Sequence, residues 1–195
     1  CMAVDPYLQY ISQHKILKAD ISIVTNVRED HIEEMGNSLE EIGQAMGTVI
    51  PTSGYFVTAD ENFFDYYKLK AKMLGSKAIF AKGNQVYSKI DFSENVAIAL
   101  EICRLLKVDE NKALKAMDNY QRDPGALKIY KLNKSSRKET LFINGFALND
   151  PESTMKVYLW LKDKGLFNER KFITIVNNRK DRPHRVRQHI NILKN

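Results

Sequence analysis

The sequence has little cysteine and no long apolar run, and these absences exclude several classes of protein. Its two cysteines, Cys1 and Cys103, are too few for the disulfide framework of a small secreted domain, and reducing, cytosolic conditions fit them best. No Cys-x-x-Cys pair or closely spaced Cys/His set occurs, so we expect no structural zinc site. No run of 18 or more apolar residues is present, and the sequence therefore predicts no transmembrane helix.

Charge is distributed unevenly along the 195 residues, whose net charge is +6. Residues 122–195 hold 17 Lys/Arg against 7 Asp/Glu, a net charge of +10, whereas residues 1–121 carry a net charge of −4. A basic half favours an anionic partner, such as nucleotide phosphates, a polycarboxylate or nucleic acid. A charged, solvated surface without a specific partner explains the same composition.

Strand and helix signals alternate in the first part of the chain. Apolar, β-branched runs at residues 19–27, 54–58 and 77–81 predict strands. Helical patterns occupy residues 38–46, 60–74, 93–107 and 109–119. Ser38 and Asp60 are the expected N-caps of the first two helices, Glu41 would complete a capping box with Ser38, and Gly75 would end the second helix. Strands separated by helices predict a parallel α/β sheet.

A break at residues 121–125, which contains Asp123-Pro124-Gly125, separates this part from the rest. Beyond it, strands are predicted at residues 126–132 and 139–144 with a polar hairpin loop at 133–138. A helix at 150–164, a strand at 171–176 and a helix at about 183–193 follow. We therefore expect part of one α/β domain at residues 1–121 and the start of a smaller α/β domain at residues 122–195.

A polar segment at residues 25–31 (TNVREDH) follows the first predicted strand. In open α/β sheets, ligands bind at the carboxyl ends of strands. Asp30 and His31 could there bind a metal or orient a phosphate-bound water, and the oxygen-rich surroundings favour magnesium. Two alternatives remain: a structural histidine, or a solvated acidic turn formed with Glu33 and Glu34.

A second polar segment, at residues 177–187 (NNRKDRPHRVR), follows the last predicted strand. The guanidinium groups of Arg179, Arg182 and Arg185 suit phosphate or carboxylate oxygens, although a solvated basic loop is the alternative. Aromatic residues are not interleaved with these cations, which disfavours a platform for single-stranded nucleic acid. Upstream, Asp150 is a plausible N-cap with Pro151 at the first helical position, and helix N-termini also hold anions.

Taken together, these motifs resemble the Mur-ligase superfamily. Residues 26–36 (NVREDHIEEMG) resemble its magnesium motif, residues 91–99 (DFSENVAIA) its adenine-binding segment, and residues 123–125 (DPG) its junction into the C-terminal domain. The subgroup that makes poly-γ-glutamate is the most similar, through CMAVDP at residues 1–6, NVREDH, DPGA, NGFALND and the strand followed by NRKDR. The resemblance covers nearly the whole chain.

The resemblance implies a fold and an activity. Residues 1–121 would be the C-terminal portion of a central ATP-binding domain, and residues 122–195 a C-terminal α/β domain. The implied enzyme is a ligase that uses ATP and Mg²⁺ to polymerise glutamate through γ-carboxyl linkages, with an acyl phosphate intermediate. Its implied partners are glutamate, the growing poly-γ-glutamate chain and membrane-bound subunits at the inner face of the cell membrane. No nucleic acid is expected, and a homo-oligomer is possible.

The resemblance also implies roles for single residues. His31 would hold magnesium or its water, and Asn95 would read adenine. The other expected nucleotide contacts come from asparagines: Asn26, Asn149 and Asn177. The expected catalytic residues lie in the polar segment 177–187, called the basic segment below: Arg179, Asp181, Arg182 and Arg185. The three arginines would bind nucleotide or acyl phosphate, and the Asp181 carboxylate would orient them or contact ribose.

The sequence also departs from the superfamily pattern. Met46 stands where Mur ligases carry a modified lysine, and Ala126 replaces an arginine after the Pro-Gly junction. No Gly-rich loop ending in Gly-Lys-Ser/Thr is present, so we expect the chain by itself to lack ATP turnover and to bind nucleotide only weakly. The alternative function is a non-catalytic module that holds polyglutamate or RNA through the basic half.

Overall fold

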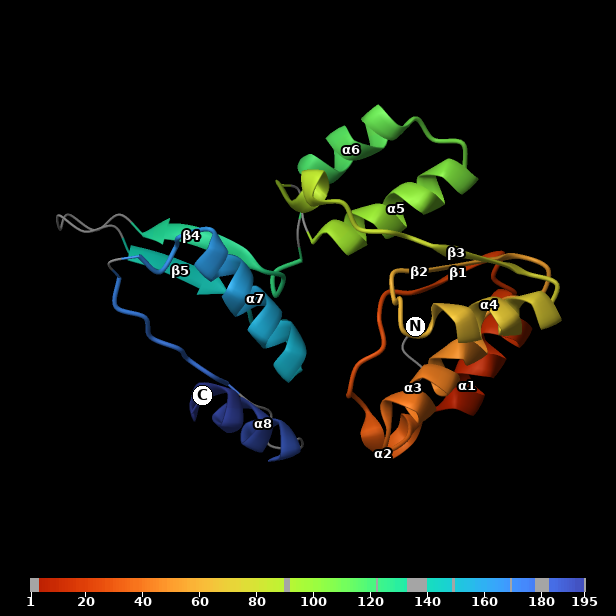
Figure 1. The fold of residues 1–195 in the computed structure, drawn as a ribbon, viewed down its shortest axis with the longest axis horizontal. Coiled ribbons are helices and arrows are strands. Elements are labelled where there is room, and N and C mark those ends of the chain that lie inside the picture. The colour runs from red at the N-terminus through yellow and green to blue at the C-terminus, as the bar shows by residue number, and fades with distance from the viewer. Residues whose placement is uncertain are drawn as a thin grey trace. The chain divides into compact units, whose positions relative to one another are not determined.

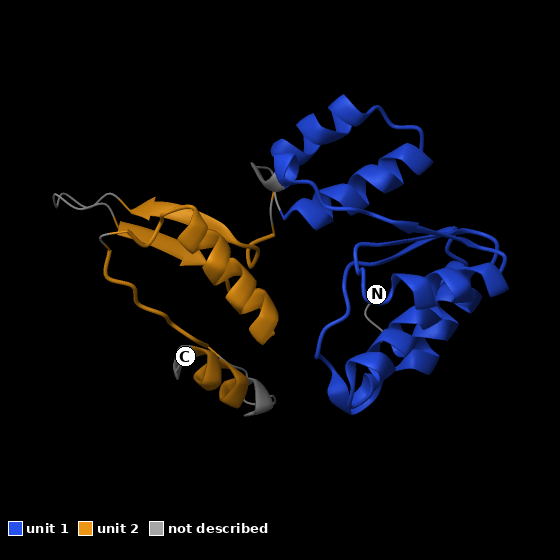
Figure 2. Cartoon of the chain, viewed as in Figure 1, with its two compact units in different colours: residues 1–120 blue, residues 121–195 orange. Residues whose placement is uncertain are grey.

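The computed structural model describes residues 4–89, 92–121, 123–132, 140–148, 150–168, 170–177 and 183–194 (Figure 1). The chain divides into two compact units, Cys1–Tyr120 and Gln121–Asn195 (Figure 2). The predicted boundary after residue 121 lies one residue from this division. Within the described ranges, no helix has the length and apolar character needed to cross a membrane.

Unit 1 is built on a parallel sheet of three short strands, in the order β1-β2-β3. These are β1 (Ile21–Val24), β2 (Tyr55–Thr58) and β3 (Lys77–Phe80). In register, Val24 pairs with Thr58 and Thr58 with Phe80, so all three strands end at the same edge. The predicted parallel sheet is confirmed, although the first strand is shorter than predicted because only four of its residues pair.

The predicted helices of unit 1 form close to their expected ranges, as α3 (Leu39–Met46), α5 (Ser93–Leu105) and α6 (Glu110–Asp118). Ser38 caps α3 as predicted, because its Oγ accepts a hydrogen bond from the Glu41 backbone N–H at 3.2 Å. The Glu41 carboxylate bonds the backbone N–H of Asn37 at 2.6 Å, one residue earlier than a capping box requires. The helix start is therefore held from both sides.

The start of the next helix was predicted wrongly. α4 spans Phe64–Met73 rather than beginning directly after Asp60, and its N-cap is Phe63. One oxygen of Asp60 accepts the Phe63 N–H, but the other reaches across to the Val27 N–H of the loop after β1. Asp60 therefore accepts one local hydrogen bond and one tertiary hydrogen bond. The sequence pattern does not reveal the tertiary one.

Several short elements of unit 1 were not predicted. They are α1 (Pro6–Tyr10), the π-helical η1 (Ile11–Leu17), α2 (Ile32–Met35) and the 3₁₀ turns η2 (Gly47–Val49) and η3 (Gln85–Lys89). The N-terminal helices are tied to η2, since His14 Nε2 lies 2.9 Å from the Thr48 carbonyl and Thr48 Oγ1 donates to Gln9 at 3.3 Å. Such short helices depend on tertiary contacts rather than on propensity.

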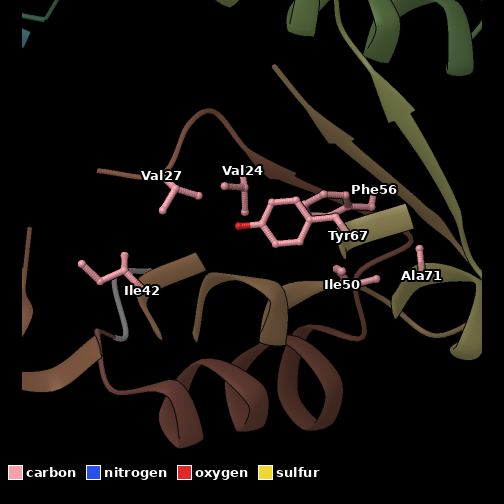
Figure 3. Close-up of a cluster of buried hydrophobic side chains, with 7 residues drawn as sticks. All are labelled: Val24, Val27, Ile42, Ile50, Phe56, Tyr67 and Ala71. Carbon is pink, nitrogen blue, oxygen red and sulfur yellow. The ribbon is translucent and has the colours of Figure 1, made fainter. Parts of the chain in front are cut away.

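Helices cover both faces of the sheet. On one face, α3 and α4 pack against β1 and β2 through a buried cluster (Figure 3): Val24, Val27, Ile42, Ile50, Phe56, Tyr67 and Ala71. Tyr67 meets Phe56 edge-to-face at 5.0 Å and donates its hydroxyl to the Gly43 carbonyl at 3.0 Å. Burial raises the pKa of the Tyr67 phenol above its usual range, and the negative charge of Asp60 acts in the same direction. On the other face, Val57 packs with residues of α5.

The described part of unit 2 contains an antiparallel pair of strands and two helices. β4 (Lys128–Leu132) pairs with β5 (Thr140–Asn144), α7 spans Pro151–Asp163 and α8 spans Pro183–Lys194. Asp150 caps α7 as predicted, because its Oδ1 accepts the Ser153 N–H at 2.8 Å. The predicted hairpin loop at residues 133–138 lies outside the described residues.

The strand predicted at residues 171–176 is wrong. These residues are irregular and exposed, with Ile173 and Ile175 about three-quarters accessible. A β-branched run becomes a strand only when another strand satisfies its backbone groups. In the described part of unit 2, β4 and β5 pair with each other and with no third strand. The sequence pattern therefore indicates a β-propensity at residues 171–176 that does not lead to a strand in the structure.

Candidate functional site

Polar residues that follow the adjacent strands β1 and β2 lie at one edge of the unit 1 sheet. The segment 25–31 leaves β1 at this edge, and Ala59 and Asp60 leave β2 beside it. Two predicted site residues, Asn26 and His31, lie on the first segment, and Asn26 is half-buried. The carboxyl edge of an open α/β sheet is where ligands bind in such folds, which makes it the candidate site.

His31 lies between two carboxylates rather than in apolar packing. Its Nε2 is 3.6 Å from an oxygen of Asp30, its Nδ1 is 4.0 Å from an oxygen of Glu34, and its side chain is 19% exposed. The His31 backbone N–H also donates to Asp30 at 3.0 Å. With φ of 53°, His31 adopts the left-handed conformation directly before α2, which a non-glycine residue takes up only when its surroundings hold it.

Asp60 connects the two loops at this edge, whereas the local sequence pattern indicates only a capping role for it. Its side chain is buried, and its oxygens accept hydrogen bonds from the Val27 N–H at 2.7 Å and the Phe63 N–H at 3.1 Å. Its own N–H donates to Thr58 Oγ1 at 3.1 Å. The signal that could have revealed it is its place two residues beyond a buried strand adjacent to β1.

Magnesium requires few protein ligands, and the edge meets that requirement only in part. Within the described ranges, no group of three or more His, Cys, Asp and Glu side chains is arranged to hold a metal. Magnesium keeps several waters and commonly takes one or two carboxylates together with substrate phosphates. Asp30 and His31 offer oxygen and nitrogen atoms 3.6 Å apart on a partly exposed turn, which fits such an incomplete site but not an all-protein cage.

An open hollow of about 520 Å³ lies beside α2 and α3, close in sequence to His31. Its lining includes three glutamates, Glu33, Glu34 and Glu41, and no lysine or arginine. A carboxylate-lined hollow repels phosphate oxygens. It is therefore not the place where the phosphates of a nucleotide would bind.

Asn95, the predicted adenine contact, lies on a different element from Asn26 and His31. It is exposed near the start of α5, whereas the next three residues of the helix are buried. α5 packs over the face of the sheet opposite α3 and α4. The Asn95 side chain therefore does not pack in the core, because the buried face of α5 is formed by other residues.

Most of the predicted residues of unit 2 are not described. Asn149, Arg179, Asp181 and Arg182 lie outside the described residues, and Arg185 lies in the first turn of α8 with its side chain likewise outside them. Asn177 is exposed at the end of the irregular segment that follows α7. The roles of these residues stay predictions.

The chain is similar to known proteins over nearly its full length. Residues 129–195 match the family described as the poly-gamma-glutamate synthase CapB C-terminal domain. The chain is 36% identical over 195 residues to the capsule biosynthesis protein CapB of Bacillus anthracis, covering 96% of this chain and 42% of that protein. It is also 36% identical over 198 residues to the PGA synthase CapB of Bacillus subtilis (strain 168), covering 98% of this chain and 50% of that one. It thus spans about half the length of these relatives.

A solved structure supports the fold. MurF from Acinetobacter baumannii aligns with a TM-score of 0.59 at 16% sequence identity, covering 80% of this chain and 39% of that one. At this identity, the likeness bears on the fold alone, and it agrees with the parallel α/β sheet of unit 1. The predicted Mur-ligase-like fold is therefore confirmed. The sequence likenesses and the fold together identify the chain as a Mur-ligase-like chain of the poly-γ-glutamate synthase CapB type.

Proposed function

We propose that the chain is part of an ATP-dependent ligase that joins glutamate units through their γ-carboxyl groups. The observation that carries this proposal is the 36% identity, over nearly the whole chain, to two CapB proteins, one named for capsule biosynthesis and one as a PGA synthase. The proposed partners are glutamate, the growing chain and membrane-bound subunits, with the enzyme at the inner face of the cell membrane. A homo-oligomer is compatible with this arrangement.

The proposed reaction has two steps. A glutamate γ-carboxylate attacks the terminal phosphorus of ATP, which forms an acyl phosphate and releases ADP. The amine of the incoming unit then attacks the acyl carbon, loses a proton and expels phosphate, which leaves an amide. Both steps develop negative charge on phosphate oxygens, so cations and hydrogen-bond donors around those oxygens accelerate them.

This reaction needs residues that hold magnesium and residues that contact the nucleotide and its phosphates, and the chain offers candidates for both. At the sheet edge, Asp30 and His31 would hold magnesium, which supplies charge neutralisation at the phosphates when bound. Asn26, on the same segment, would contact the nucleotide, and Asn95 on α5 would read adenine. In unit 2, Asn149, Asn177 and the basic segment with Arg179, Asp181, Arg182 and Arg185 would contact the phosphate groups and the ribose.

Paired histidine substitutions in the full-length protein test the sheet edge. His31→Ala should lower the rate of ATP-dependent glutamate polymerisation by about 10- to 100-fold, with partial recovery at high magnesium, because a residue that holds the metal is lost. His14→Ala is the matched control, since that imidazole faces the Thr48 carbonyl and stacks on Tyr10. Equal kinetics for His31→Ala and the unmodified protein would remove His31 from the mechanism.

A substitution that keeps the charge tests the basic segment. Arg182→Lys should lower the polymerisation rate, because lysine cannot reproduce the planar guanidinium fork that binds two oxygens at once. Arg187→Lys, on the exposed part of α8, should leave the rate unchanged. If both substitutions are silent, only the overall positive charge of the segment contributes.

A non-catalytic module that binds polyglutamate or RNA is the second candidate, and the net charge of +10 over residues 122–195 favours it. Salt weakens both kinds of binding, so salt dependence does not separate them. Competition between polyglutamate and RNA for the protein, with and without ATP, does. Binding of either polymer without any ATP-dependent amide formation by the full-length protein would favour this second candidate.

A further inference from the structure

We propose that Asp60 is a positioning residue, which holds the segment carrying Asn26 and His31 in place at the sheet edge. The catalytic consequence rests on the function proposed above, whereas the positioning itself does not. The proposal starts from a buried carboxylate that bridges two loops, a role that local sequence signals do not require.

The bridge needs a carboxylate in particular. Asp60 has two acceptor oxygens, and each faces a backbone N–H, one from Val27 and one from Phe63. Hydrogen bonds to a charged acceptor are stronger than those between neutral groups. The Asp60 carboxylate is such an acceptor, and it is buried. An asparagine at the same place has one acceptor oxygen, and its amide group would point hydrogens at one of the two N–H donors.

The segment after β1 is irregular, and Val27 is one of the residues that anchor it. Residues 25–31 contain no helix or strand between β1 and α2. Val27 anchors the segment twice, because its side chain packs in the buried cluster of unit 1 and its N–H donates to Asp60. Asn26 lies directly before Val27, and His31 lies four residues after it. The direction in which this segment leaves β1 therefore depends on the contacts of Val27.

The Asp60 bridge also links the loops that follow two neighbouring strands, β1 and β2. β1 and β2 are adjacent and parallel, with Val24 opposite Thr58, so their exit loops begin side by side. Thr58 Oγ1 accepts the Asp60 N–H, which turns the chain after β2 so that the carboxylate faces Val27. The residues after the neighbouring strand therefore help to position the segment that carries Asn26 and His31.

The test uses Asp60→Asn in the full-length protein, with two controls. Amide hydrogen exchange should become about tenfold faster for residues 25–31, since a hydrogen bond to a charged acceptor is lost there. The magnesium concentration for half-maximal polymerisation should rise by about tenfold, as expected when a residue that orients a metal ligand is removed. Asp109→Asn, at the N-cap of α6, controls for loss of charge, and Leu100→Ala, in a separate cluster, controls for general destabilisation.

The outcomes separate this proposal from the function. Unchanged exchange over residues 25–31 in Asp60→Asn, or an equal change in either control, would overturn the positioning role. Faster exchange together with a shifted magnesium requirement supports both the positioning role and the function. Faster exchange in Asp60→Asn, with no magnesium effect in either Asp60→Asn or His31→Ala, supports the positioning role and contradicts the function assigned to the loop.

Discussion

The two units of the chain differ in how much core each one builds. Unit 1 buries residues from both faces of a three-stranded sheet, including Phe56 and Tyr67, which are completely inaccessible. In the described part of unit 2, the buried hydrophobic residues are Val157 and Leu161, both on α7. Unit 2 also exposes apolar side chains along its irregular segment, Phe172 to Val176. A two-stranded sheet with so little burial is marginal by itself.

The contrast shows why the same kind of sequence pattern led to different outcomes. In unit 1, every predicted strand found a parallel neighbour and helices that cover it. In unit 2, the predicted strand at residues 171–176 is also rich in β-branched residues but has no strand beside it in the described part of the chain. Propensity becomes structure where a partner satisfies the backbone and buries the side chains.

The largest expected effect compares the two cores directly. Phe56→Ala should lower the free energy of unfolding of unit 1 by about 3–5 kcal/mol, because a fully enclosed ring leaves a cavity. Leu161→Ala should cost unit 2 about 2 kcal/mol, the low end for a buried leucine, because Val157 is the only other buried hydrophobic residue in the described part of unit 2. Urea unfolding followed by residue-resolved hydrogen exchange measures each unit separately. A larger loss for Leu161→Ala would break the comparison.

A second prediction probes how tightly unit 1 is packed. A Cβ at Gly43 would lie 2.2 Å from a ring carbon of Phe63, so Gly43→Ala should cost about 1–3 kcal/mol of unfolding free energy. Gly47→Ala provides the comparison, because its Cβ would lie 3.2 Å from the nearest ring carbon, of Tyr67, which is tight but far less so than at Gly43. We expect a smaller cost for that change than for Gly43→Ala, because its neighbours need to shift by only a few tenths of an ångström. Similar losses for both variants would mean that the contact between Gly43 and Phe63 does not limit the packing of α3.

A third prediction compares one helix cap in each unit. Asp109 accepts the Lys112 N–H at 2.9 Å, and Asp150 accepts the Ser153 N–H at 2.8 Å. Replacing either by alanine should cost about 1 kcal/mol, because the hydrogen bond has the same geometry in each unit. Thermal unfolding with hydrogen exchange over α6 and α7 measures both. A negligible cost at Asp150 would show that α7 is not held by its cap.

The smallest expected effect lies in the exposed segment of unit 2. Ile175→Lys should change the unfolding free energy by less than about 0.5 kcal/mol, because the side chain is about three-quarters exposed. Ile129→Lys, at a half-buried position of β4, provides the comparison and should cost more. Equal, large losses for the two variants would mean that residues 171–176 form a paired strand after all.

The place of His31 after β1 could be predicted from sequence, whereas the contacts that hold its segment depend on residues far along the chain. His31 was placed beyond the first strand because the strand run and the polar segment are contiguous. The role of Asp60 was not predicted, because Val27 is 33 residues away along the chain. The acidic surroundings of His31 followed from sequence, but the left-handed backbone that aims it between Asp30 and Glu34 did not.

The sequence by itself determined the strand–helix alternation of unit 1, the Pro-Gly break and the caps at Ser38 and Asp150, because each depends on residues within one or two turns of chain. Only the tertiary structure decided which strand tendencies became strands, where α4 begins and what holds the segment after β1. Those outcomes depend on which backbone groups meet across the sheet, and local patterns carry no record of partners that the chain brings together only on folding.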